Sequence, residues 1–313
     1  MKHNKTLILS FSNIRAADLS RVGGKGANLG EMTQAGFPIP NGFCLTTAAF
    51  QRFMDSCPDS EDIYAQLDTI APDDVEMVRS VGERIRRTLL SVPIPDDVTK
   101  AVKKAWQDVG TEQAYAVRSS ATAEDLPDAS FAGQQDTYLN IIGQADLLDA
   151  IRRCWVSLFT DRAILYRSQN NYPHREVQLS VVVQKMVMSE ISGVLFTADP
   201  LTGHRHTLTM DASFGLGEAL VSGLVSPDAY RVDKRTRTIL DRQIADKQIA
   251  ILPARNGGTH QVALSEAQRK QAVLTDTEVL ALADLGARVE AHYGTPRDIE
   301  WSRAGGQIYL LQS

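Results

Sequence analysis

The sequence contains little cysteine, few aromatic residues and no long apolar run. The three cysteines, Cys44, Cys57 and Cys154, stand far apart in 313 residues, and this spacing argues against a disulfide framework and against a structural zinc site. No apolar stretch approaches the roughly 20 residues that span a bilayer. The short apolar run Leu7–Leu9 is interrupted before it could form the core of a secretion signal. We therefore expect a cytoplasmic protein with reduced cysteines and no membrane partner.

An excess of positive charge is also missing. Lys and Arg number 33 against 38 Asp and Glu, which gives a formal net charge of -5. A protein that neutralises a nucleic-acid backbone needs a concentrated basic surface, so we expect no nucleic-acid partner. A local anion site remains compatible with this balance. The length suits two average domains or one large domain with a sizeable core.

Hydrophobic periodicity predicts a mostly helical first part and a strand-rich remainder. Apolar residues at helical spacing predict helices over residues 47–54, 78–89 and 98–109. From about residue 115 onward, β-branched runs and alternating segments predict strands. A capping box at Thr275 and Glu278 begins a late helix, and the chain ends in a hairpin around Gly305 and Gly306.

Two familiar glycine motifs fail on inspection. A Walker A loop needs Ser or Thr after its lysine, whereas Lys25 is followed by Gly26. The segment Gly215–Leu220 starts like a dinucleotide fingerprint, but Leu220 occupies the third glycine position. Neither a P-loop nor a Rossmann site is expected.

The glycines around Lys25 indicate a simpler anion site. Backbone N–H groups at the start of the helix after Gly24, together with the Lys25 ammonium, suit a phosphate. An exposed lysine in a glycine turn explains this segment equally well.

Arg118 is the second candidate. It follows a short predicted strand, Tyr115–Val117, and opens a polar segment of small hydroxyl residues that we expect to be a loop. A guanidinium there can present two donors to a phosphate. The alternative is a salt bridge to one of three nearby carboxylates, which belong to Glu124, Asp125 and Asp128. Further on, Gly133 permits close backbone approach to a ligand and Thr137 can hydrogen-bond it.

The C-terminal hairpin supplies the third candidate. Asp298 and Glu300 are two apart on a strand, so both carboxylates project from one face and suit Mg²⁺ on nucleotide phosphates. Gln312 joins that face if the turn has three residues, 304–306, which pairs Gln312 with Asp298. A two-residue turn places it on the other face, and we predict the three-residue turn. The alternative is a solvated acidic strand.

Taken in order, these segments closely resemble the nucleotide-binding domain of phosphoenolpyruvate synthases, pyruvate phosphate dikinases and rifamycin phosphotransferases. The segments that carry the resemblance are Val22–Met32, Pro38–Phe43, Val117–Asp125, Phe131–Gln134, Asp298–Trp301 and Leu311–Ser313. The resemblance covers essentially the whole chain. It implies an α+β, ATP-grasp-like fold in which two lobes clamp the nucleotide and a small subdomain completes a single domain. We expect lobe 1 over about residues 1–115 and lobe 2 over about residues 116–313.

The resemblance also implies roles for particular residues. Lys25 and Arg118 match residues that bind phosphate and take part in catalysis, and Asp298 matches a catalytic acidic residue. Gly133 and Thr137 match a flap over the phosphates, and Gln184 matches the residue at the adenine. The remaining two matches, to phosphate and Mg²⁺ ligands, are Glu300 and Gln312. ATP and Mg²⁺ are therefore the expected cofactors.

In the family that the sequence resembles, ATP phosphorylates a histidine on a swivelling domain and AMP is released. That histidine passes phosphate to pyruvate or an antibiotic, and the segment Phe214–Asp228 slightly favours a rifamycin-like acceptor. No segment resembles the phosphohistidine or acceptor domain, and the family's Arg-Pro after the final motif is missing after Ser313. We therefore expect ATP and Mg²⁺ binding without the overall reaction. The competing hypothesis is a standalone regulatory module that binds nucleotide without phosphotransfer.

Overall fold

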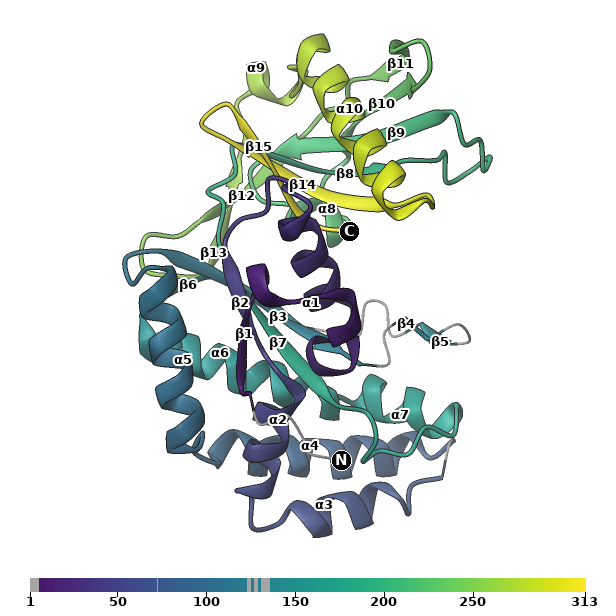
Figure 1. Cartoon of the computed structure of the whole chain (residues 1–313). Coiled ribbons are helices and arrows are strands. Elements are labelled where there is room, and N and C mark those ends of the chain that lie inside the picture. Colours follow the sequence, from purple (N-terminus) through teal and green to yellow (C-terminus); the bar gives the residue numbers. More distant parts are fainter. Residues whose placement is uncertain (1–5, 72, 123–124, 127–128, 131–135) are drawn as a thin grey trace. The chain divides into compact units, whose positions relative to one another are not determined.

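A computed structural model describes residues 6–71, 73–122, 125–126, 129–130 and 136–313 of the chain. The chain folds into two compact units (Figure 1). Unit 1 contains residues 1–36 and 41–186, and unit 2 contains residues 37–40 and 187–313. The contacts thus divide the chain near residue 187. The reason is that the strand beginning at Ala114 pairs with the strand that ends at Lys185 and belongs to the same sheet.

Unit 1 is built on a five-stranded antiparallel sheet in the order β1-β2-β7-β3-β6. Its strands are β1 (Ile8–Ser10), β2 (Gly42–Leu45), β3 (Ala114–Ala121), β6 (Thr137–Ile142) and β7 (Leu179–Lys185), with a separate pair β4 (Asp125–Leu126) and β5 (Ala129–Ser130). Its helices are α1 (Leu19–Gln34), α2 (Thr47–Asp55), α3 (Ser60–Leu67), α4 (Val75–Ser91), α5 (Asp96–Val109), α6 (Gln144–Val156) and α7 (Asp161–Gln169), with short 3-10 turns at Phe11–Asn13, Ala16–Asp18 and Ser157–Phe159.

The two faces of this sheet have different partners because side chains alternate along each strand. Val117, Val181 and Val183 point into one hydrophobic core. The apolar faces of α2 to α7 complete this core. α1 packs on β3 and β7, and Ser120 of β3 lies directly against Gly23 of that helix. The face that carries the even-numbered residues of β3 therefore belongs to α1.

The helices predicted from apolar spacing are confirmed. In α4 the predicted apolar residues Val78, Val81, Ile85 and Leu89 are all buried. The helix α5 ends at Val109, and the following Gly110 has φ 134°. The predicted polar loop after Val117 is wrong at its start. Residues 118–121 continue β3, because their backbone pairs with residues 179–182 of β7 and their side chains are buried.

Unit 2 is a six-stranded antiparallel sheet in the order β11-β10-β9-β8-β14-β15, with α10 packed on one face (Figure 1). Its strands are β8 (Ile191–Phe196), β9 (Thr207–Phe214), β10 (Asp228–Asp233), β11 (Thr238–Gln243), β14 (Asp298–Ala304) and β15 (Gln307–Gln312), with a separate pair β12 (Ile249–Pro253) and β13 (Thr259–Ala263). Its helices are α8 (Glu218–Val221), α9 (Glu266–Arg269) and α10 (Asp276–Tyr293).

The late capping box is confirmed at the start of α10. The Thr275 hydroxyl accepts from the Glu278 N–H, and the Glu278 carboxylate accepts from the Thr275 N–H. Gly286 of α10 lies so close to Leu195 and Leu208 that an added Cβ would meet Leu195 at 2.7 Å. The even-numbered residues of β14 lie on the other face of the sheet, because Ile299 pairs with Leu195 and shares the face of α10.

Both predicted classes of secondary structure are therefore present, with antiparallel sheets and helices in each unit, and the α+β class is confirmed. The three cysteines are buried and free, as expected from their spacing. Among the described residues, no helix is both long and apolar enough to cross a membrane.

Candidate functional site

The helix α1 is interrupted at Gly23. This residue has φ 67° and ψ 175°, which is not helical, so a second helical segment begins at Gly24. A Cβ at Gly23 would lie 2.3 Å from Ser120 Oγ and 2.6 Å from the Ser120 carbonyl oxygen. Only glycine combines that backbone conformation with that proximity. The predicted glycine-rich start of a helix is confirmed, and its position is set by contact with β3.

Ser120 fixes the start of the second helical segment. Its buried hydroxyl accepts a hydrogen bond from the Gly26 N–H, at 3.4 Å. Lys25 lies between the two buried glycines Gly24 and Gly26 and is itself half-buried. Lys25 thus directly precedes Gly26, whose N–H donates to Ser120 of β3, and it lies next to backbone N–H groups at a helix start.

Arg118 lies on the same face of β3, two residues before Ser120. It is 7 % exposed, and its Nη1 donates to Gln184 Oε1 on the neighbouring strand β7 at 2.6 Å. Arg118 pairs in register with Val182, so Gln184 is its diagonal neighbour on one face of the sheet. Two of the predicted residues are therefore in direct contact, although they are 66 positions apart in the sequence.

Among the described residues, the oxygen of the Gln184 side-chain amide has a hydrogen-bond partner and the nitrogen has none. Its residue is 1 % exposed, and Nε2 is buried without a hydrogen-bond partner among the described residues. The bond from Arg118 assigns the oxygen side of the amide to the arginine. Two donor hydrogens are therefore left for another group, and a buried donor without a partner is costly.

Thr137 begins β6 and lies in register opposite Arg118. Residues opposite each other in an antiparallel pair share a face, so Thr137 joins the face of Arg118, Ser120 and Gln184. Gly133 lies outside the described residues, as do Glu124 and Asp128, while Asp125 is described only in its backbone. The alternative of a salt bridge from Arg118 to that segment is therefore not tested by the structure.

A thiol lies beneath the same part of α1, but it is not a nucleophile. An added Cβ at Gly26 would lie 3.0 Å from Cys44 Sγ. Complete burial raises the pKa of the Cys44 thiol far above its ordinary value, so Cys44 stays neutral. The chemistry available on this face is therefore that of hydrogen-bond donors and cations.

In unit 2 the hairpin brings Glu300 opposite Gln312. The predicted three-residue turn is wrong, since Ala304 pairs with Gln307 around a two-residue Gly305-Gly306 turn. Both glycines have positive φ, 57° and 75°, as a type I′ turn requires. A shift of register between Glu300 and Trp301 then inserts one extra residue on β15. Gln312 therefore reaches the face of Glu300, but it pairs with Glu300 and not with Asp298.

The face of the unit 2 sheet opposite α10 carries a further carboxylate that the sequence did not single out. Glu300 is opposite Val194, and Val194 is opposite Asp211 on β9, so Glu300 and Asp211 share a face across one intervening strand. Desolvation by burial raises the pKa of Asp211 above its ordinary value. The alternation of β9 was the available signal, but without the strand order it could not indicate which neighbours Asp211 has.

The metal ligands predicted in unit 2 do not form a complete cage. Among the described residues, no group of three or more His, Cys, Asp or Glu side chains could hold a metal ion. Mg²⁺ does not need such a group, because it is commonly bound by one or two carboxylates together with substrate phosphates and water. Glu300, Gln312 and the exposed Asp298 fit that donor set.

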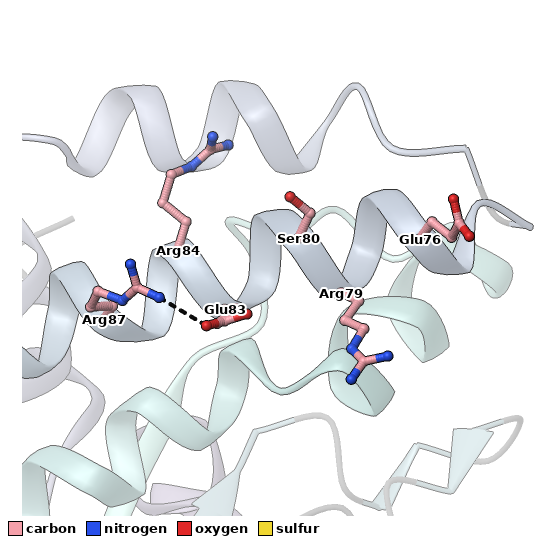
Figure 2. Close-up of a pocket in the computed structure, with 6 residues that line it drawn as sticks. All are labelled: Glu76, Arg79, Ser80, Glu83, Arg84 and Arg87. Atoms are coloured by element: carbon pink, nitrogen blue, oxygen red, sulfur yellow. Dashed lines mark hydrogen bonds and ion pairs between the residues drawn. The ribbon is translucent and has the colours of Figure 1, made fainter.

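The pocket shown in Figure 2 is lined only by residues of one face of α4. It carries charges of both signs, and Arg87 pairs with Glu83 at 2.8 Å (Figure 2). This is the pattern of a solvated helix surface. None of the predicted site residues lines it.

Unit 1 thus carries cationic and hydrogen-bonding side chains on one face of its sheet, and unit 2 carries acidic residues on one face of its own sheet. Residues 19–313 match the model of the pyruvate phosphate dikinase AMP/ATP-binding domain, and the chain belongs to this family. The expected resemblance and the ATP-grasp-like α+β fold are thereby confirmed.

Several curated proteins are similar over nearly the whole chain. A rifampicin phosphotransferase from a Streptomyces species is 48% identical over 98% of this chain and 35% of its own length. The rifampicin phosphotransferase of Bacillus subtilis is also 48% identical, over 98% of this chain and 36% of its own length. A probable phosphoenolpyruvate synthase of Methanothermobacter thermautotrophicus is 44% identical over 97% of this chain and 45% of its own length. The chain thus spans between a third and a half of the length of these relatives.

Proposed function

We propose that this chain binds ATP and Mg²⁺ as the nucleotide-binding domain of a dikinase-type phosphotransferase. The observation that carries the proposal is the arrangement on one sheet face of unit 1. There Arg118, Gln184 and Thr137 lie beside the helix start that Ser120 anchors, in a chain that belongs to an AMP/ATP-binding family.

In this proposal the residues of unit 1 bind the nucleotide itself. Lys25 and Arg118 neutralise phosphate oxygens and keep them in line for transfer, because phosphoryl transfer depends chiefly on positioning and charge neutralisation. The Thr137 hydroxyl and the Gly133 backbone donate to the same phosphates. Gln184 uses its unpartnered Nε2 on a ring nitrogen of the base.

The residues of unit 2 complete the proposal. Glu300 and Gln312 hold Mg²⁺ and phosphate oxygens, and Asp298 on the same strand face acts as the catalytic acidic residue. The bound Mg²⁺ would neutralise charge on the phosphate oxygens as the phosphoryl group leaves.

The reaction proposed for the whole protein is phosphorylation of a histidine on a swivelling domain. ATP gives up two phosphoryl groups and leaves as AMP; one group is transferred to the histidine, and the other is transferred to water and released as inorganic phosphate. A rifamycin-like antibiotic or pyruvate then receives the phosphoryl group from the histidine. The names of the relatives support this scheme, since they include rifampicin phosphotransferases and a probable phosphoenolpyruvate synthase. The alternative is a regulatory module that binds nucleotide and transfers nothing.

Calorimetric titration with ATP and Mg²⁺ tests the binding proposal. Losing a charge-assisted hydrogen bond to phosphate costs roughly 1.5–3 kcal/mol, so Lys25→Ala should weaken ATP binding by about tenfold to a hundredfold. The matched control is Lys100→Ala, which removes an exposed lysine from α5 and should leave the affinity unchanged. Equal affinities for the two variants would refute the role of Lys25.

A second experiment separates the enzyme from the regulatory module. The chain is mixed with a separately made histidine-bearing domain of a rifampicin phosphotransferase, and nucleotide products are followed by chromatography. The dikinase proposal predicts AMP and a phosphorylated histidine. ATP that binds but stays intact would favour the regulatory alternative.

A further inference from the structure

The strand β6 contains a bulge at Asn140. Its register against β3 changes by one residue, because Tyr115 pairs with Ile141 whereas Val117 pairs with Tyr138. Leu139 and Asn140 therefore both stand opposite Ala116. Asn140 has φ 57° and is 1 % exposed. One buried residue in a left-handed conformation thus supplies the extra position.

The bulge decides which face Thr137 occupies. Tyr138 and Ile141 both pack against the hydrophobic core of unit 1, although an unbroken strand would send residues three apart to opposite faces. If the register at Tyr115 continued without the extra residue, Tyr138 would stand opposite Arg118 and Thr137 would turn toward the core. The extra residue keeps Tyr138 in the core and brings Thr137 opposite Arg118.

The backbone of Asn140 is hydrogen-bonded to Met186. Asparagine is one of the few residues other than glycine that adopt positive φ readily. The Asn140 N–H donates to Met186 Sδ at 2.9 Å, and the Met186 N–H donates to the Ala114 carbonyl at 2.9 Å. The bulge is therefore tied to the strand pair that carries Arg118 and Gln184.

We propose that Asn140 is a positioning residue for nucleotide binding, acting through Thr137. Its left-handed bulge aims the Thr137 hydroxyl at the face where Arg118 lies, so that both can reach the same phosphates. This inference rests on the proposed function and adds to it a residue that touches no nucleotide.

The test compares Asn140→Gly with Asn140→Ala in calorimetric titrations with ATP and Mg²⁺. Both variants lack the amide, but only alanine resists positive φ, so the pair isolates the backbone conformation. Asn140→Gly should bind ATP within about twofold of the wild type. Asn140→Ala should bind roughly threefold to tenfold more weakly than Asn140→Gly. Equal affinities for the two variants would overturn the proposal.

A second pair of variants distinguishes positioning from general stability. Thr137→Val removes the hydroxyl from an exposed residue while keeping its shape. If Asn140 acts through that hydroxyl, the difference between glycine and alanine at position 140 should fall below about twofold when Thr137→Val is present. An undiminished difference would overturn the proposal, and so would a Thr137→Val variant that binds ATP like the wild type. A wild-type chain that binds no ATP would instead refute the proposed function itself.

Discussion

Substitution of glycine by alanine at Gly23, within α1, and at Gly36, just after α1, should have unequal effects. Gly23 and Gly36 both have positive φ, 67° and 75°. The left-handed conformation costs an alanine roughly 1–2 kcal/mol at either position. An added Cβ at Gly36 meets nothing within 4 Å, whereas at Gly23 it would lie 2.3 Å from Ser120 Oγ and 2.6 Å from a backbone oxygen. The two positions therefore share the unfavourable backbone conformation, whereas only Gly23 has the steric conflict.

The expected magnitudes follow from this difference. Gly36→Ala should lower the free energy of unfolding of unit 1 by about 1 kcal/mol and leave ATP affinity unchanged. Gly23→Ala should cost a further 1–3 kcal/mol or so, because a carbonyl oxygen cannot move aside as a flexible side chain does. It should also weaken ATP binding, since the helix start that carries Lys25 must shift away from Ser120.

Urea unfolding monitored by circular dichroism gives the stabilities, and hydrogen exchange of residues 24–34 reports the helix start. Calorimetry with ATP and Mg²⁺ gives the affinities. Two variants that are equally stable and bind ATP equally well would show that contact with Ser120 does not position this helix, and the account of unit 1 would be wrong.

Two further predictions concern pH and stability. Burial raises the pKa of Asp211, so its contribution to stability is present at low pH and is lost as pH rises through the folded pKa. Asp211→Asn should therefore stabilise the protein at pH 7 by up to about 1 kcal/mol, after allowance for solvent screening. In urea titrations at pH 3 the same variant should give no gain in stability. Burial, with a smaller contribution from Arg167, lowers the pKa of His174 to about 4 from 6.5, so the stability that it contributes is present above pH 6.5 and is lost as pH falls toward 4. The wild type should lose on the order of 2 kcal/mol more than His174→Gln across that range, and equal losses would contradict the burial of a neutral imidazole.

Local periodicity predicted the helices well because a helix is specified by neighbours three and four residues apart. The apolar spacing in α4 and the capping box at Thr275 are complete within a few turns of chain. The hairpin strands could be placed for the same reason, but not their register. The two-residue turn alone would place Gln312 on the face opposite Glu300, and a single extra residue on β15 returns it to the face of Glu300.

The errors arose where pairing partners are distant in the sequence. Arg118 was expected in a loop because its polar neighbours look unlike a core strand, yet β7 pairs with them from more than 50 positions away. Asp211 and Asn140 gave no sequence signal as site residues, since their importance depends on which strand lies beside them.

The most direct test of the central claim is the effect of Arg118→Ala on binding of ATP and of adenosine. Arg118 is proposed to neutralise phosphate, while its bond to Gln184 affects the base only through the orientation of the amide. The variant should lose about tenfold or more in ATP affinity and less than about threefold in adenosine affinity. Equal losses for the two ligands, or a wild-type chain that does not bind ATP in the presence of Mg²⁺, would contradict the account.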